Sequence, residues 1–139
     1  MRAINIVKRQ QLNYMNAYNA ICEVQGHGTW NVLVSYCTPV LATDGNTLIA
    51  LNDATCSHTT AKHVGAWLRR FAPSYSYRDV KHALDAHNGS TCDVGANKPS
   101  PTAQHAWIYE LPAMQPCKRF CNGLYYIGKD KGPWSRIAC

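Results

Sequence analysis

Residues 36–71, Y-C-T-P-V-L-A-T-D-G-N-T-L-I-A-L-N-D-A-T-C-S-H-T-T-A-K-H-V-G-A-W-L-R-R-F, carry the clearest structural signal of the chain. Within them, Asp44-Gly45 lies between two short apolar segments, residues 39–42 and 48–51. An Asp-Gly pair is a strong hairpin signal, because both central positions of such a turn need a positive φ. The pair therefore predicts a β-hairpin.

The sequence after this hairpin predicts a helix over residues 58–71. Ser57 or Thr55 is placed to cap it, since a hydroxyl before the first turn accepts an otherwise unpaired backbone N–H. One sector of about 120° is apolar, and it holds Ala61, Val64, Trp67, Leu68 and Phe71. The side chains outside that sector are His58, Thr59, Lys62, His63, Arg69 and Arg70. We expect the apolar sector to pack on a core and the other face to meet solvent.

The flanking sequence extends this pattern. Residues 19–35 alternate between apolar and polar side chains around a Gly-His-Gly turn at residues 26–28, which predicts another hairpin. Ser76 and Asp79 form a variant capping box at the start of a second helix, and Asn-Gly at residues 88–89 ends it.

Residues 89–101 are rich in turn formers and are expected to form a loop, while residues 106–111, 124–128 and 134–138 read as strands. The fold predicted for residues 1–139 is a single α+β domain. It has an antiparallel sheet built from hairpins, with two helices packed on one face.

Composition and charge narrow the class of protein. The chain is 46% hydrophobic and 16% charged, which is typical of a folded chain, and its formal net charge is +6. The positive excess favours acidic partners and argues against an acidic mimic of DNA. The N-terminal apolar run is too short for the core of a signal peptide, and no window approaches the ~18 apolar residues of a membrane span. We expect a cytoplasmic protein with no membrane partner.

Neither the cysteines nor the acidic residues suggest a metal centre or an active site. The seven cysteines are expected to stay reduced, with three disulfides and one free thiol as the alternative. Cys117 and Cys121 form one close pair, whereas a structural zinc site usually needs two, so free buried thiols are favoured and no cofactor is expected. No two acidic residues form a local catalytic motif. A cysteine nucleophile with a histidine base stays open, but an enzyme is not the favoured class.

The start of the helix at residues 58–71 has the character of an anion site. Backbone N–H groups of the first turn point outward with the positive end of the helix dipole, which attracts phosphate or carboxylate. Hydroxyl, imidazole and cationic side chains surround this end, and the candidate ligand-binding residues are Ser57, Thr59, Thr60, Lys62, His63, Arg69 and Arg70. The alternative is that Ser57 and Thr60 only cap the helix and that the basic face is simply solvated.

A second basic region lies near the C-terminus, where cations and aromatic rings are interleaved. Bases stack on such rings while cations follow the phosphates of a nucleic acid. The residues concerned are Lys118, Arg119, Lys129, Lys131 and Arg136, with Tyr109, Tyr125, Tyr126 and Trp134. Rings on strands are more often half-buried parts of a sheet, so nucleic-acid binding is the second hypothesis.

The motifs Y-x-T-P-V at residues 36–40, Asp44-Gly45, and S-x-T-T-x-K-H-V at residues 57–64 resemble small proteins encoded by phages and other mobile elements. The resemblance covers about thirty residues of the chain. It implies a compact accessory protein made inside an infected bacterium, where antagonists of host immunity are common. Some are sponges for cyclic or linear nucleotide signals, as in anti-Thoeris and anti-CBASS proteins, and others are anti-CRISPR proteins that bind an effector or its guide RNA.

Together these observations favour a non-enzymatic inhibitor of bacterial antiviral defence that sequesters a phosphorylated nucleotide in the host cytoplasm. A homo-oligomer is expected, because a ligand held between subunits is better enclosed than one held by a single small domain. Nucleic-acid binding, including binding to a CRISPR effector or its guide RNA, is the alternative. A module that docks on a host defence protein is the third possibility.

Overall fold

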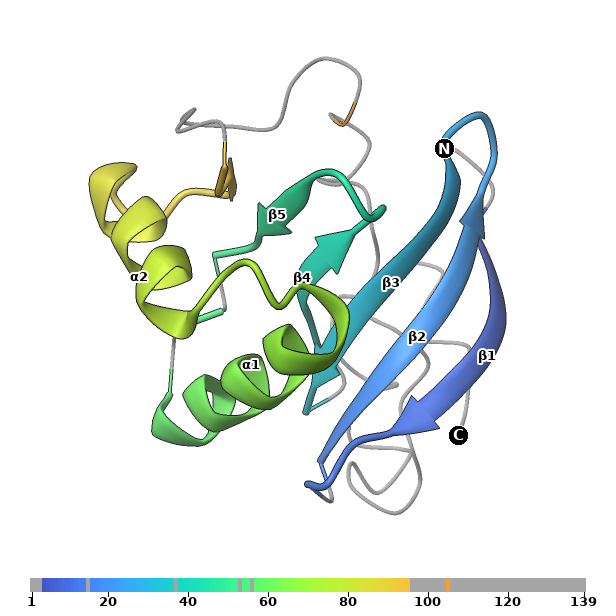
Figure 1. Cartoon of the computed structure of the whole chain (residues 1–139), viewed down its shortest axis with the longest axis horizontal. Coiled ribbons are helices and arrows are strands. Elements are labelled where there is room, and N and C mark those ends of the chain that lie inside the picture. Colours follow the sequence, from blue (N-terminus) through green and yellow to red (C-terminus); the bar gives the residue numbers. More distant parts are fainter. Residues whose placement is uncertain are drawn as a thin grey trace, which may run out of the picture.

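The computed structural model describes residues 4–14, 16–36, 38–52, 54–55, 57–95 and 105, and these contain a six-stranded antiparallel sheet. Its strands follow the chain in the order β1-β2-β3-β4-β5-β6, so each strand pairs with its predecessor (Figure 1). The strands are β1 (Ile4–Gln11), β2 (Ala17–Val24), β3 (Gly28–Ser35), β4 (Thr38–Thr43), β5 (Leu48–Ala50) and β6 (Cys92–Asp93).

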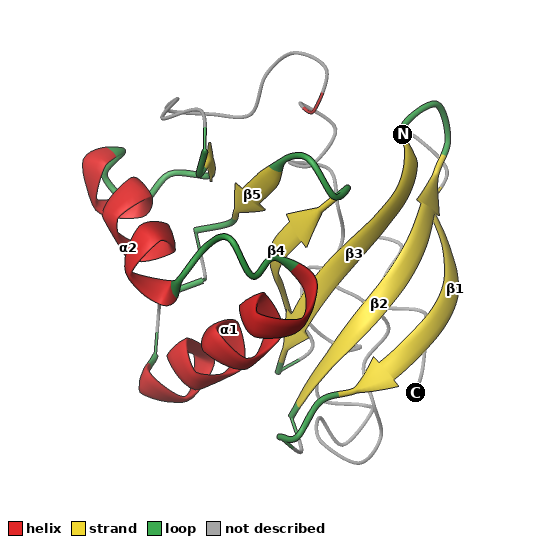
Figure 2. Ribbon diagram, viewed as in Figure 1, coloured by secondary structure: helices red, strands yellow, loops and turns green. Residues whose placement is uncertain are grey.

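Two helices, α1 (His58–Phe71) and α2 (Tyr77–Ala86), cover the same face of this sheet (Figure 2). The Ser57 hydroxyl caps α1 by accepting the Thr60 N–H. Ser76 and Asp79 form a complete capping box at the start of α2. Gly89, with φ 78°, donates its N–H to the Leu84 carbonyl at 2.6 Å and closes the end of α2. The α+β fold and both helix starts are therefore as predicted.

Both faces of the sheet are buried from β2 to β5, because side chains that alternate along these strands enter two separate hydrophobic clusters. Leu33, Leu41 and Leu48 face the helices and pack with Val64, Trp67, Leu68, Val80 and Leu84. Trp30, Val32, Val34, Ala42 and Ile49 belong to the cluster on the opposite face. His105 lies edge-on to Trp30 there, with the ring centroids 5.2 Å apart.

The Asp44-Gly45 turn joins β4 and β5 as predicted, but by a different mechanism. Gly45 has a φ of 99°, whereas Asp44 does not have a positive φ. Instead, the Asp44 carboxylate accepts the backbone N–H groups of Asn46 at 2.9 Å and Thr47 at 2.8 Å. A side-chain acceptor that mimics a backbone turn thus replaces the second left-handed residue.

Three expectations need correction. β1 forms over residues for which no strand was predicted, and most of its side chains are exposed or half-buried. β6 lies inside the predicted loop at residues 89–101, where Cys92 pairs with Ala50. The buried sector of α1 includes Thr60 and His63, although His63 was expected on the solvent face.

The strands predicted at residues 106–111, 124–128 and 134–138 fall outside the described residues, as does the C-terminal basic and aromatic region. Within the part of the chain that is described, neither helix has both the length and the apolar character needed to cross a membrane.

Candidate functional site

A hollow of about 660 Å³ lies along the exposed side of α1, and we call it the α1 groove. It is lined by Tyr14, Thr55, Ser57, His58, Ala61, Lys62, Gly65, Arg69 and Tyr77. None of these described lining residues is acidic, and two are cations. A mobile anion in this hollow would therefore meet positive charge without a competing carboxylate from the described lining residues.

The helix sets the geometry of the groove, since its lining residues recur at three- and four-residue intervals along one stripe of α1. At the N-terminal end, Ser57 accepts the Thr60 N–H at 3.0 Å and its carbonyl accepts the Ala61 N–H at 3.0 Å. The amides of His58 and Thr59, earlier in the first turn, have no carbonyl within the helix to donate to. No acidic side chain in that turn offsets the dipole.

Two tyrosines border the groove from outside α1. Tyr14 comes from the turn between β1 and β2, where its carbonyl accepts the Gln11 side-chain amide at 2.7 Å. Tyr77 is the first residue of α2. The groove thus combines cations from one helix with tyrosines from two other elements.

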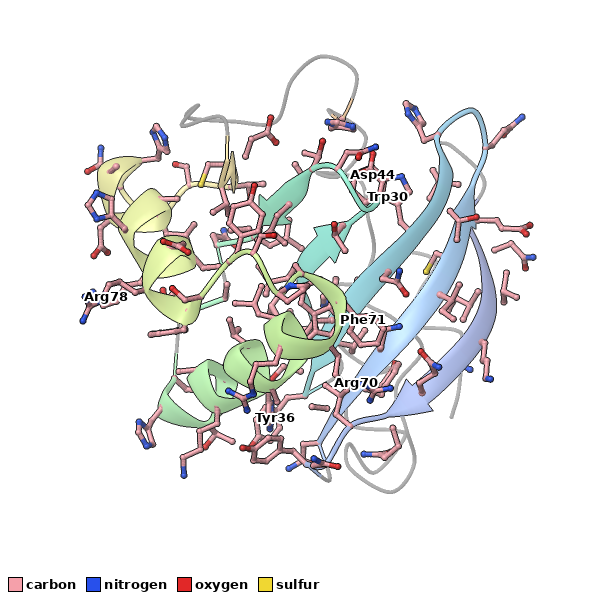
Figure 3. The ribbon with its side chains drawn as sticks, in the orientation of Figure 1. Trp30, Tyr36, Asp44, Arg70, Phe71 and Arg78 are labelled. Carbon is pink, nitrogen blue, oxygen red and sulfur yellow. The ribbon has the colours of Figure 1, made fainter. Side chains whose placement is uncertain are left out.

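The structure divides the predicted ligand-binding residues into three groups. Ser57, Lys62 and Arg69 line the α1 groove. Thr59 and Arg70 are exposed but do not line it, and the Arg70 guanidinium lies 5.1 Å from the Phe71 ring centroid (Figure 3). Thr60 and His63 point inward and are 3% and 1% exposed.

Sequence reasoning missed Tyr14 altogether and assigned Tyr77 only to the apolar face of α2. Tyr14 is distant from α1 in sequence and reaches it through the β1–β2 turn. Neither tyrosine carries a local motif that would mark it as part of a site. The seven-residue spacing of Lys62 and Arg69 on α1 was the one available signal for a continuous cationic stripe.

On the buried side of α1, Thr60 and His63 join a polar cluster with the end of β3. Ser57 Oγ donates to Thr60 Oγ1 at 2.9 Å. Thr60 Oγ1 lies 3.3 Å from Ser35 Oγ, which lies 2.8 Å from His63 Nδ1. A chain of hydroxyls therefore connects an exposed groove residue to a buried imidazole.

Two aromatic rings enclose His63. The Tyr14 ring centroid is 5.1 Å from that of His63, and the Tyr36 centroid is 5.6 Å away. Tyr36, directly after β3, has a φ of 51°, which is a left-handed backbone conformation. Burial lowers the pKa of His63 below its ordinary value, because it penalises the charged imidazolium. Tyr14 thus contacts both the groove and the buried histidine.

A second polar link fixes α1 one turn further along. The Trp67 indole N–H donates to Asn19 Oδ1 at 2.8 Å. The Asn19 side-chain amide donates to Asn31 Oδ1 at 2.9 Å and to Gln10 Oε1 at 3.2 Å. Asn19 is fully buried, so these bonds satisfy a group that would be costly to leave unpaired. α1 is therefore held on the sheet in one rotational setting.

The part of the chain that builds this site also carries a family signature. A family model described as a family of unknown function, DUF8033, matches residues 1–82 of the 139. The chain belongs to the DUF8033 family. Its DUF8033 region contains β1 to β5, α1 and the start of α2, and hence every described residue that lines the α1 groove. No curated protein and no solved structure matches the chain.

Proposed function

We propose that this protein binds a phosphorylated nucleotide in the α1 groove and withholds it from a bacterial antiviral defence pathway, as the product of a phage or other mobile element. The observation that carries the proposal is the lining of the groove. Two cations, the N-terminal end of α1 and two tyrosine rings border one hollow whose described lining contains no acidic residue.

Each part of that lining suits a part of a nucleotide. The free first-turn amides and Ser57 suit a phosphate, and Lys62 adds charge at the start of the next turn. Arg69, two turns beyond Lys62 on α1, is placed for a second phosphate or a ribose. The rings of Tyr14 and Tyr77 offer surfaces on which a base can stack, a contact that contributes about 1–3 kcal/mol per base.

Size and openness favour a small ligand that is shared between copies. A volume of about 660 Å³ is within the range of small-molecule sites, which spans roughly 300–1,000 Å³. The groove is open along α1, so a second copy of the chain would enclose a bound nucleotide more completely. The anti-defence role is supported by the resemblance of residues 36–64 to proteins of mobile elements.

The test is a charge reversal with a matched control on the same helix. Lys62→Glu places a carboxylate in the groove, whereas Arg70→Glu makes the same change in net charge on an exposed residue outside it. Lys62→Glu should weaken binding at least about tenfold, or about 1.4 kcal/mol. Arg70→Glu should change it far less. Binding is measured by calorimetry with a panel of linear and cyclic dinucleotides, chosen after mass spectrometry of nucleotides that co-purify with the protein.

Two results would contradict the assignment. Equal losses from both substitutions would point to diffuse electrostatic attraction and hence to nucleic acid. Unchanged affinity in a folded Lys62→Glu protein would exclude the α1 groove as the binding site.

A further inference from the structure

The directions of the hydrogen bonds between the groove and His63 depend on one another. Each hydroxyl has one proton to donate. Ser57 gives its proton to Thr60 Oγ1, so Thr60 can give its own to Ser35, and Ser35 can give its own to His63 Nδ1. In this arrangement Nδ1 is an acceptor, and His63 is neutral.

Protonation of His63 reverses the direction in which each of these groups donates its hydrogen bond. Both ring nitrogens of an imidazolium carry hydrogen, so Nδ1–H must donate to Ser35 Oγ. The Ser35 hydroxyl then donates to Thr60, and the Thr60 hydroxyl donates to Ser57. The Ser57 proton is left to point into the α1 groove, where Ser57 is a lining residue. A phosphate oxygen in the groove is the acceptor that completes the reversed chain.

We propose that anion binding in the α1 groove is coupled to protonation of His63 through reversal of this hydroxyl chain. The proton comes from solvent and resides on Nδ1. The protein therefore takes up a proton as it binds a phosphodiester, and it binds that ligand more tightly in acid. This inference rests on the proposed function, since it needs an anion in the groove.

The surroundings of His63 favour the neutral form in the free protein and allow the charged form in the complex. Burial disfavours the imidazolium and lowers the pKa of His63. Among the described residues, the ionisable side chains in ring contact with it are Tyr14 from the β1–β2 turn and Tyr36, directly after β3. Phenol rings on either side of an imidazolium attract it through their π faces. A phosphate oxygen that accepts the Ser57 hydroxyl proton completes the reversed chain and shifts the balance toward the charged form of His63.

The first test uses the dinucleotide UpU, whose phosphodiester keeps a single charge throughout the titration of a histidine. The His63 ring signals are followed by NMR against pH, with and without saturating UpU. The pKa of His63 should be higher in the complex. An unchanged pKa at saturation overturns the coupling while leaving the proposed function standing, whereas absence of UpU binding at every pH overturns both.

The second test interrupts the chain of hydrogen bonds by removing the Thr60 hydroxyl. His58 is a second histidine and lines the groove itself, so all proteins compared carry His58→Gln. In that background, affinity for UpU at about pH 5.5 should exceed that at about pH 7.5 by roughly tenfold. Adding Thr60→Val should abolish this ratio, because valine keeps the shape of threonine and lacks the hydroxyl. Thr59→Val, at the exposed neighbouring position, should preserve it. A ratio that survives Thr60→Val, or is lost in Thr59→Val as well, overturns the proposal.

Discussion

At the scale of single residues, the burial of His63 makes the stability of the folded protein depend on pH. It is a histidine that is 1% exposed, hydrogen-bonded to Ser35 and in contact with two tyrosine rings. Burial lowers its pKa in the folded protein, so the unfolded chain binds a proton more readily. The folded state is therefore favoured when His63 is neutral.

The free energy of unfolding of the ligand-free protein should accordingly depend on pH. The contribution of His63 to the free energy of unfolding is fully present above the pKa of a histidine in the unfolded chain, about 6.5. It is lost as the pH falls from that value through the lower folded pKa, with a slope of at most about 1.4 kcal/mol per pH unit. Urea unfolding of the wild type and of His63→Gln across this range measures the difference.

His82→Gln on α2 is the matched control, because His82 is exposed. The control should retain the pH dependence of the wild type, and His63→Gln should have a weaker one. The interpretation fails if both variants follow the wild-type curve.

At the scale of elements, α1 is held to the sheet by two polar links in addition to its apolar face. His63 reaches Ser35 at the end of β3, and Trp67 reaches Asn19 in β2. Each link joins a helix residue to a different strand. The pair sets which side of α1 faces solvent and so forms the α1 groove.

Removing the second link should be costly. Trp67→Phe keeps an aromatic ring in the core but leaves Asn19 Oδ1 buried without its indole donor. An unsatisfied buried acceptor costs about 1–3 kcal/mol, so the urea midpoint should fall accordingly. Combining Trp67→Phe with Asn19→Ala should cost less than the sum of the two single changes. Additive effects would show that the two side chains do not act as a pair.

The elements differ in how far the sequence could predict them. Ser57, Ser76 and Asp79 carry strong local signals, and the two helices begin where these caps place them. β6 is too short for a periodic pattern, since only Cys92 and Asp93 pair with β5. β1 has few buried side chains to produce alternation, because it lies at one edge of the described sheet.

The candidate site was predictable only on its own helix. Lys62 and Arg69 belong to the charged face of α1, which the helical period defines. His63 shares that face by polarity, yet Ser35 on β3 provides a polar partner that draws it inward. Tyr14 reaches the groove only because the β1–β2 turn ends beside α1. The spacing of side chains within residues 58–71 therefore could not predict that Ser35 and Tyr14 lie beside this helix.

At the scale of the whole molecule, the net charge of +6 attracts any anion, so charge alone does not distinguish a nucleotide from a nucleic acid. The salt dependence of binding does distinguish these two classes of ligand. A nucleic acid that contacts six or more phosphates loses about 10³-fold or more in affinity between about 50 and 200 mM salt, whereas a ligand with one or two phosphates loses far less.

Binding of UpU and of a long oligouridine should therefore be titrated at both salt concentrations. We expect UpU to bind with a shallow salt dependence and the oligomer to gain little beyond it at the higher concentration. A steep loss, with strong preference for the oligomer, would favour the nucleic-acid hypothesis instead.

The order of the strands bears on how the chain comes together during synthesis. Each strand from β2 to β5 pairs with the strand made just before it, so each pairing closes only a short loop. Asn19 and Ser35, the sheet residues that receive Trp67 and His63, both precede α1 in the sequence. The sheet residues that hold these two α1 side chains are therefore made by the ribosome before the helix itself.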